Sequence, residues 1–367
     1  SYMSQKKIIL FFPSIEKGGA EKNLFIIANY LCNKFKKLKV ISCSKDAKKK
    51  FNKKIEFLCP DYEIWDNFGR GIKTFISIIF LIKQILQDRK IVVLSFQANV
   101  YAVIVCKIFS IKIITRSNSF PGDWSNSSLK NFVFKIILPL ANTSIVNSIE
   151  TKKKFKSNYK INAKCIYNPL NSRDILKLSN KKIKSIYLNK NSLKIIHVGR
   201  FSEEKDHNTF LNALRFINSK INFEAIIMGR GKLKNKILKI IDKNKLKKKV
   251  RIIDYKKNPY PYIKQADFLI LTSLHEGLPN ILLEAIILKK FVISSNCPTG
   301  PREILDNGKG GGLFKVGIPR ELAKKIVLYS KKKKLRKEKI RYAFSRIGRF
   351  DYEFNLELYS NLIKKYY

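Results

Sequence analysis

Short apolar segments alternate with longer amphipathic segments along almost the whole chain. Residues 7–12 have the pattern of a buried strand, and residues 22–34 place Leu24, Ile27 and Leu31 on one face of a helix. Such alternation is typical of α/β units built on parallel sheets. It predicts further strands in the first half of the chain, over residues 40–42, 91–95, 112–115, 145–147 and 165–167.

A polar stretch rich in Lys and Asn interrupts this series and predicts a linker over residues 171–192. A second α/β series follows, with strands predicted at 193–198, 223–228, 250–253, 268–272 and 291–294. The 367 residues are enough for two domains. We therefore predict two doubly wound, Rossmann-like α/β domains facing across a cleft, over residues 3–170 and 193–350. A last helix, over 351–367, could pack back on the first domain.

The chain carries a formal net charge of +48, mostly as dispersed Lys. Either Lys replaces other surface residues throughout, or the charge attracts phosphate-rich partners such as nucleic acid, anionic lipid or nucleotides. No zinc-finger spacing, aromatic RNA-binding motif or basic heptad region accompanies the charge, and this argues against a specific nucleic-acid partner.

The six cysteines lie far apart and form no C-x-x-C pair, a pattern typical of reduced thiols in a cytosolic protein. The longest uncharged stretch, residues 91–106, is interrupted by Gln97 and Asn99. It falls short of the ~20 apolar residues that a bilayer span needs. We expect a cytoplasmic protein without a membrane-spanning helix.

The segment 273–284 carries the richest chemistry. It follows an apolar strand and opens a helix at Pro279, and the N–H groups of a first helical turn favour an anion. Glu276 lies in the loop before this helix and Glu284 in its second turn. Two carboxylates beside an anion suit a hydroxyl-rich ligand, because sugar and ribose hydroxyls can donate a hydrogen bond to each. A capping Glu and a solvated Glu are the alternative.

The strand over 193–198 is followed by Gly199, which permits a tight turn, and then by Arg200 and Lys205. Arg binds phosphate oxygens with two N–H groups and Lys acts as a point charge, so the pair could neutralise a diphosphate. Two further glycine pairs follow strands, Gly18 with Gly19 and Gly229 with Gly231. Alone, each glycine pair is only a weak indication of a phosphate-binding loop, because most such pairs occur in ordinary turns.

Together these residues resemble the retaining glycosyltransferases of family 4, which have the GT-B fold. The resemblance rests on Glu276-x7-Glu284 and on the segment from Gly199 to Asp206. Other matching pieces follow in the same order over essentially the whole chain, at residues 18–21, 166–169, 258–262 and 299–303.

The resemblance implies a role for each matching residue. Glu276 would lie by the transferred sugar, with Arg200 and Lys205 on the diphosphate, and these three are the candidate catalytic residues. Glu284 would bind the ribose, and the base would lie near Tyr255. The remaining candidate donor-binding residues would approach the sugar and phosphates through their backbone: Gly18, Gly19, Gly199, Gly277, Leu278 and Asn280.

Two departures from the family pattern stand out. The turn after the Glu-x7-Glu helix reads Lys289-Lys-Phe-Val292 where the family usually has Gly-x-Pro. The first-domain His that many members carry is absent from residues 95–99. No catalytic role is transferred to that position, and Asn99, Arg116 and Asn118 are the candidates for the acceptor side. No Asp-x-Asp pair occurs, so we expect no metal requirement and no cofactor.

The expected function is transfer of a hexose or N-acetylhexosamine from a nucleotide-diphosphate sugar, with UDP as the expected nucleotide, to a glycan or polyprenyl-diphosphate-linked acceptor. A nucleotide-sugar epimerase or hydrolase of the same fold is the alternative enzyme, and a nucleic-acid-binding protein is a third hypothesis. Two basic-apolar stretches, 72–83 and 130–140, predict peripheral association with the anionic inner face of the cytoplasmic membrane. Ordinary helix packing would give the same pattern.

Overall fold

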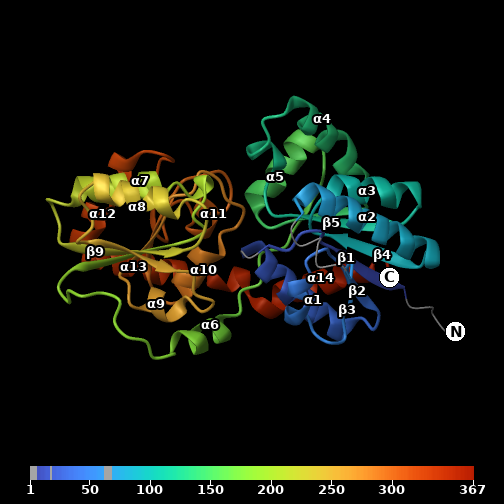
Figure 1. Ribbon diagram of the computed structural model, residues 1–367, viewed down its shortest axis with the longest axis horizontal. Coiled ribbons are helices and arrows are strands. Elements are labelled where there is room, and N and C mark those ends of the chain that lie inside the picture. The colour runs from blue at the N-terminus through green and yellow to red at the C-terminus, as the bar shows by residue number, and fades with distance from the viewer. Residues whose placement is uncertain (1–5, 17–18, 62–67) are drawn as a thin grey trace. The chain divides into compact units, whose positions relative to one another are not determined.

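The computed structural model describes residues 6–16, 19–61 and 68–367. The chain divides into two compact units, each with its own parallel sheet. The first unit runs to Pro169 and regains Glu353–Tyr367 from the end of the chain, while the second unit comprises Leu170–Tyr352. The two sheets and the helices that cover them are shown in Figure 1.

The sheet of the first unit contains seven strands within the described residues, in the order β3-β2-β1-β4-β5-β6-β7, and every recorded pairing is parallel. The order reverses direction between β1 and β4, which is the doubly wound pattern. The strands are β1 (Lys7–Phe11), β2 (Leu38–Ile41), β3 (Glu56–Leu58), β4 (Ile91–Ser95), β5 (Lys112–Ser117), β6 (Thr143–Val146) and β7 (Lys164–Cys165).

Helices cover both faces of this sheet. One face carries α1 (Gly19–Lys34) and α14 (Tyr352–Lys364), and the other carries the four helices between β3 and β7 (Figure 1). These four are α2 (Arg70–Gln87), α3 (Asn99–Ile108), α4 (Ser128–Ile137) and α5 (Ile149–Tyr159). Short 3-10 turns occur at Lys45–Lys50, Pro121–Asp123 and Leu138–Leu140. Apolar side chains of β1, β4 and β5 form one core with α2 and α3.

The sheet of the second unit has six strands among the described residues, in the order β10-β9-β8-β11-β12-β13, and they too pair in parallel. The order reverses between β8 and β11. The strands are β8 (Leu193–Val198), β9 (Phe223–Gly229), β10 (Val250–Asp254), β11 (Phe268–Leu271), β12 (Phe291–Ser295) and β13 (Gly312–Phe314).

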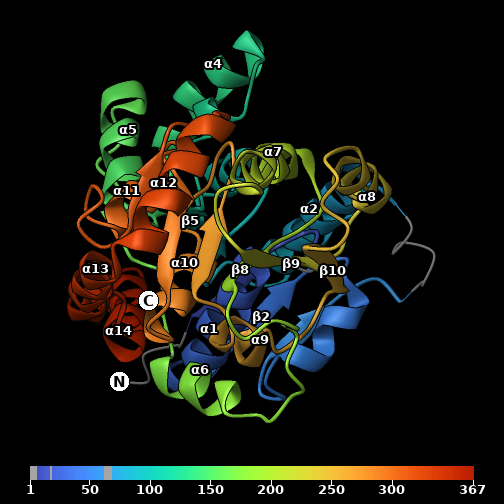
Figure 2. The same ribbon diagram turned by 90° about the vertical axis from the view of Figure 1, so that its left-hand side faces the viewer.

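On one face of the second sheet lie α7 (His207–Ile217), α8 (Lys234–Lys243) and α12 (Pro319–Lys331), and α6 (Ser172–Ser179) and α9 (Tyr260–Lys264) lie on the other (Figure 2). The remaining helices are α10 (Asn280–Ile287), α11 (Pro301–Ile304) and α13 (Lys333–Ser345), with short 3-10 turns at Glu203–Lys205 and Ile347–Phe350. Two doubly wound α/β domains are therefore confirmed.

The segment expected to be a linker, residues 171–192, contains α6 and groups with the second unit. Asn171 caps α6 by accepting a hydrogen bond from the Asp174 N–H at 3.2 Å. Close to the point where the chain passes from one unit to the next, Leu170 pairs with Asp351 as a parallel bridge. The final helix, α14, packs on the first unit: the Lys6 ammonium donates to the Tyr366 carbonyl at 2.7 Å.

The structure also contains two strands that the sequence patterns do not predict, β3 and β13, each of three residues. No helix in the described part of the chain is long and apolar enough to cross a membrane.

Candidate active site at the carboxyl edge of the second sheet

The candidate site residues of the second unit follow the carboxyl ends of neighbouring parallel strands. Gly199, Arg200 and Lys205 come after β8, Tyr255 comes directly after β10, and residues 273–279 lie between β11 and α10. Because all these strands run in parallel, their carboxyl ends meet at one edge of the sheet. The fold thus brings these residues, which lie up to about 80 positions apart in the sequence, to one edge of the sheet, here called the rim.

At the centre of this rim, Lys205 and Glu276 form an ion pair through Nζ and Oε1, with side chains that are only 20% and 13% exposed. Ser273 donates from its Oγ to the same Glu276 oxygen at 2.7 Å. Burial lowers the pKa of the Lys205 ammonium, but the charge and hydrogen bond of Glu276 outweigh this and leave the pKa raised. Lys205 is therefore a fixed, largely buried positive charge that a phosphate could share.

The backbone below Lys205 is held by Thr272, whose Oγ1 donates to the Lys205 carbonyl at 2.7 Å and lies 3.1 Å from the Asp206 carbonyl. His197 Nε2 lies 3.0 Å from the same hydroxyl. Burial lowers the pKa of His197 well below its usual value and lowers the pKa of His207 to about 4. Both imidazoles are thus neutral at pH 7, and they support the site from within the core.

Glu284 lies in the second turn of α10 and is 6% exposed, whereas Leu278 is buried in the loop before that helix. Pro279 occupies the cap position directly before Asn280, the first helical residue. A helix N-terminus carries a partial positive charge, so the loop at Glu276–Leu278 lies where an anion is favoured.

The ends of β8 and β9 approach each other so closely that Gly229 can have no side chain. A Cβ at this position would lie 1.9 Å from the Gly199 carbonyl oxygen. The spacing of Gly229 and Gly231, a weak phosphate-binding signal in the sequence, is thus explained by backbone packing. Between these glycines, Arg230 places its guanidinium 4.1 Å from the ring centroid of the half-exposed Tyr255, which is a cation–π contact at the expected base position.

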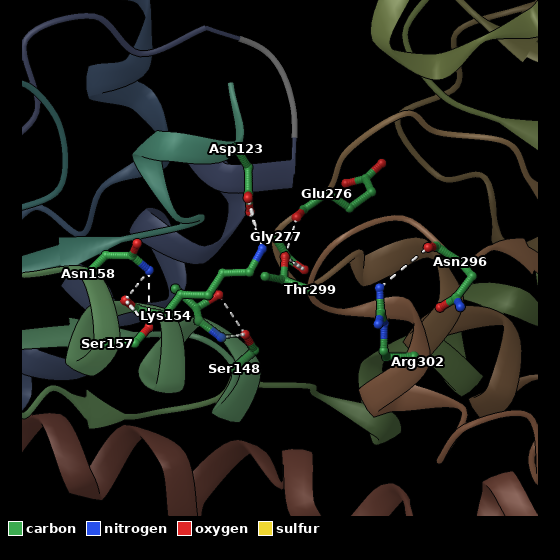
Figure 3. Close-up of polar contacts among 11 residues, drawn as sticks. Asp123, Ser148, Lys154, Ser157, Asn158, Glu276, Gly277, Asn296, Thr299 and Arg302 are labelled. Carbon is green, nitrogen blue, oxygen red and sulfur yellow. Dashed lines mark hydrogen bonds and ion pairs between the residues drawn. The ribbon is translucent and has the colours of Figure 1, made fainter. Parts of the chain in front are cut away.

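The loop after β12 completes the rim. Cys297 is fully buried, and burial together with the charge of Glu276 raises the pKa of its thiol to about 12. This cysteine is therefore a neutral packing residue. Figure 3 shows Thr299 with its hydroxyl toward the backbone of Glu276 and Gly277, and Arg302 toward the carbonyl of Asn296.

In the first unit, Gly18 lies outside the described residues and Gly19 is the first residue of α1. Asn99 opens α3, where it accepts from Ser95 Oγ at 2.7 Å and donates to the Arg116 carbonyl at 3.0 Å. Asn118 follows β5 and accepts from Arg116 Nη1 at 2.5 Å. Gly19, Asn99 and Asn118 each follow the carboxyl end of a strand of the first sheet. The acceptor role of Asn99 and Asn118 stays a prediction.

Arg116 has a different position from the one expected. Arg116 is only 1% exposed, so it lies in the interior of the first unit and not on the acceptor side. Its Nε donates to Tyr359 Oη at 2.7 Å and its Nη2 to Asn168 Oδ1 at 2.9 Å. Arg116 therefore ties β5 both to α14 and to the segment at which the chain leaves the unit. Sequence spacing did not predict this, because Tyr359 is 243 positions away.

Residues 179–346 match the family model described as glycosyl transferases group 1. A glycosyltransferase of Methanocaldococcus jannaschii is 35% identical over 178 residues, which are 47% of this chain and 44% of that relative's length. A Campylobacter jejuni N-acetylgalactosaminyltransferase, named for its diphospho-undecaprenol-linked acceptor, is 23% identical over 94% of this chain and 96% of its own. The family model covers just under half of the chain, so it is the second unit that is similar in sequence to group 1 glycosyl transferases.

Solved structures agree in fold. HepE of Anabaena, crystallised with UDP, has a TM-score of 0.78 over 98% of this chain and 100% of its own, at 18% identity. This likeness confirms the fold class, GT-B with two Rossmann-like domains. The sequence analysis gave no role to three residues that support this rim, Thr272, Ser273 and Thr299. Thr272 and Ser273 directly follow the buried strand β11, and a short polar residue in that position is the signal that could have found them.

Proposed function

We propose that this glycosyltransferase retains the anomeric configuration, needs no metal ion, and moves a hexose or N-acetylhexosamine from a UDP-sugar to a lipid-linked glycan in surface-polysaccharide assembly. The observation that carries the proposal is the largely buried ion pair of Lys205 and Glu276, in which Glu276 lies in the loop before the N-terminus of α10. It offers a cation for a diphosphate and a carboxylate for sugar hydroxyls on one rim. The UDP in the HepE structure and the undecaprenol-linked acceptor of the Campylobacter relative support the donor and acceptor classes.

The chemistry assigned to each residue follows from its charge and position. When the bond between the sugar and the diphosphate breaks, negative charge grows on the leaving phosphate. A preorganised cation such as Lys205 then stabilises the transition state more than the ground state. The exposed Arg200 on the same rim adds a second cation. Glu276 accepts from a hydroxyl of the transferred sugar, and the carboxylate of Glu284 accepts from the ribose.

Donor-dependent thermal stabilisation tests this proposal directly. UDP at 100 times its dissociation constant should stabilise the protein by about 2.7 kcal/mol, while UMP should stabilise it less because it lacks the second phosphate. A panel of UDP-hexoses and UDP-N-acetylhexosamines, read by thermal shift and then by transfer to a polyprenyl-diphosphate-linked glycan, identifies the sugar. Equal stabilisation by UDP and by unrelated anions such as inorganic sulfate would refute a specific donor site.

We also propose that the protein associates peripherally with a membrane. This proposal rests on three helices of the first unit, each of which leaves an apolar stripe exposed. Residues in these stripes are three or four positions apart and are 38–73% exposed: Ile72, Phe75 and Ile79 in α2, Tyr101, Ile104 and Ile108 in α3, and Leu129, Phe132 and Ile136 in α4. All three helices lie on the same face of the first sheet (Figure 1). A helix that served packing alone would bury such a stripe, and α4 has no buried residue at all.

Exposed lysines accompany the stripes, among them Lys83 in α2 and Lys130 and Lys135 in α4. Each Lys near an anionic bilayer contributes about 1 kcal/mol, which salt screens. Each apolar side chain that enters the interface contributes up to about 1.5–3 kcal/mol, which salt does not screen. The sequence drew attention to the stretches in α2 and α4, but the stripe of α3 became apparent only in the structure.

We therefore expect peripheral, reversible binding to anionic vesicles through this face. Flotation should show binding at low salt that weakens at high salt and is poor on neutral vesicles. The double variant Phe132→Ser/Ile136→Ser should reduce the partition coefficient about tenfold or more, and Lys130→Glu should reduce it mainly at low salt. The matched control is Lys243→Glu on α8 of the second unit, an exposed Lys with the same change of charge. Binding that ignores lipid charge, or equal loss in the control, would contradict this proposal.

A further inference from the structure

Thr299 has a backbone conformation that needs an explanation. It lies between β12 and α11, is fully buried, and has a φ of 61°. A β-branched residue in this left-handed region is a genuine outlier. Such a conformation is energetically unfavourable and persists only where the surrounding structure enforces it. The contacts that Thr299 makes in this conformation indicate its role.

This conformation accompanies contact between Thr299 and the loop that carries Glu276. Thr299 Oγ1 donates to the Glu276 carbonyl and lies 3.3 Å from the Gly277 carbonyl oxygen (Figure 3). The next residue, Gly300, also has a positive φ, and a Cβ there would lie 1.9 Å from the Gly277 carbonyl oxygen. Backbone atoms on both sides of the Glu276–Gly277 peptide thus rest against residues 299 and 300.

A second contact holds the start of the same loop. Ser295, fully buried at the end of β12, donates from its Oγ to the Ser273 carbonyl at 2.6 Å. Ser273 in turn donates from its own Oγ to the Glu276 carboxylate. Thr299 therefore fixes the backbone of Glu276. Ser295 fixes Ser273, which in turn donates a hydrogen bond to the Glu276 carboxylate. Both supports come from β12 and the loop after it.

We propose that Thr299 and Ser295 are positioning residues for Glu276, which they hold in the orientation that keeps its carboxylate on Lys205 and toward the transferred sugar. This inference rests on the proposed function. Neither side chain needs to touch the substrate, because their partners are the carbonyls of the Glu276 loop. A displacement of about 1 Å at a reacting group can cost on the order of 10²-fold in rate, so loss of one hydroxyl should appear in catalysis.

The test compares Thr299→Val, which keeps the shape but cannot donate, with Thr299→Ser, which can. Under donor saturation we expect Thr299→Val to lower kcat about tenfold or more and to change the donor KM less than about twofold, because the Lys205 and Glu284 contacts remain. Thr299→Ser should recover most of the loss. Affinity for UDP, measured by calorimetry, should be the same in all three proteins.

Several outcomes would overturn the inference. They are an unchanged kcat in Thr299→Val, no recovery in Thr299→Ser, or a loss of UDP affinity that matches the loss of kcat, since this would indicate a general collapse of the loop. Should Thr299→Val fail to fold, Ser295→Ala tests the other support, with the same expected split between kcat and KM. Failure of the proposed function is distinguishable, because the wild-type protein would then neither bind UDP nor transfer a sugar.

Discussion

Replacement of Lys205 by Met is expected to lower kcat/KM for sugar transfer about 10²–10³-fold, the usual cost of losing one preorganised charge at a developing anion. The Lys205 side chain is four-fifths buried beside Glu276, so water cannot replace its ammonium with comparable effect. Met retains the length of the side chain and removes only the charge. Steady-state kinetics with a UDP-sugar, at several donor concentrations, is the measurement.

Two controls make the Lys205 result interpretable. Lys234→Met on α8 removes a half-exposed Lys that also pairs with a carboxylate, that of Asp254 at 2.8 Å, and it should leave the rate unchanged. Excess EDTA should likewise leave the wild-type rate unchanged, because the proposal gives the diphosphate charge to Lys205 and Arg200. Reversible loss of activity in EDTA, or near-wild-type turnover of Lys205→Met, would disprove the proposed role.

The two glutamates of the Glu-x7-Glu segment are expected to differ in kinetics. Glu276→Gln should lower kcat about 10²-fold or more with a small change in donor KM, because its carboxylate acts at the reacting sugar. Glu284→Gln should raise the donor KM with a smaller effect on kcat. A hydrogen bond to a charged group contributes about 1.5–3 kcal/mol, which corresponds to a rise in KM of roughly 10–100-fold.

Gln is the better replacement here because Glu284 is buried and Ala would leave a cavity in α10. Thermal unfolding of both variants provides the control for stability, and a UDP titration separates binding from turnover. Equal changes in kcat and KM for the two variants would contradict the assignment of roles, as would a silent Glu276→Gln.

Much of the fold was predictable because its strands are strongly apolar. The strands predicted at 91–95 and 193–198 have those same bounds in β4 and β8, since burial on both faces of a parallel sheet requires a continuous apolar run. The two missed strands lack this run. Both are three residues long at the ends of their sheets, and β3 contains Glu56 while β13 begins with Gly312. Edge strands of this kind need less apolar surface.

Helix starts were less accurate. The sequence pattern placed the beginning of the first helix at residue 22, but α1 begins at Gly19, because glycines before a helix leave no periodic signal. The predicted linker also contains α6, a helix with Ile175 as its one large buried apolar side chain. Its polar composition suggested an irregular connection, and packing against α9 and α10 decided otherwise.

By itself, the sequence determined the two doubly wound domains and the rim on which Arg200, Lys205, Glu276 and Glu284 lie, because strand periodicity and the position of a residue after a strand are local properties. Only the tertiary structure decided that Lys205 pairs with Glu276, that Thr299 and Ser295 hold the Glu276 loop, and that Arg116 is buried against Tyr359. Each of these contacts joins residues from separate strands or helices. Their geometry depends on how neighbouring strands align in the sheet, which no local pattern of residues encodes.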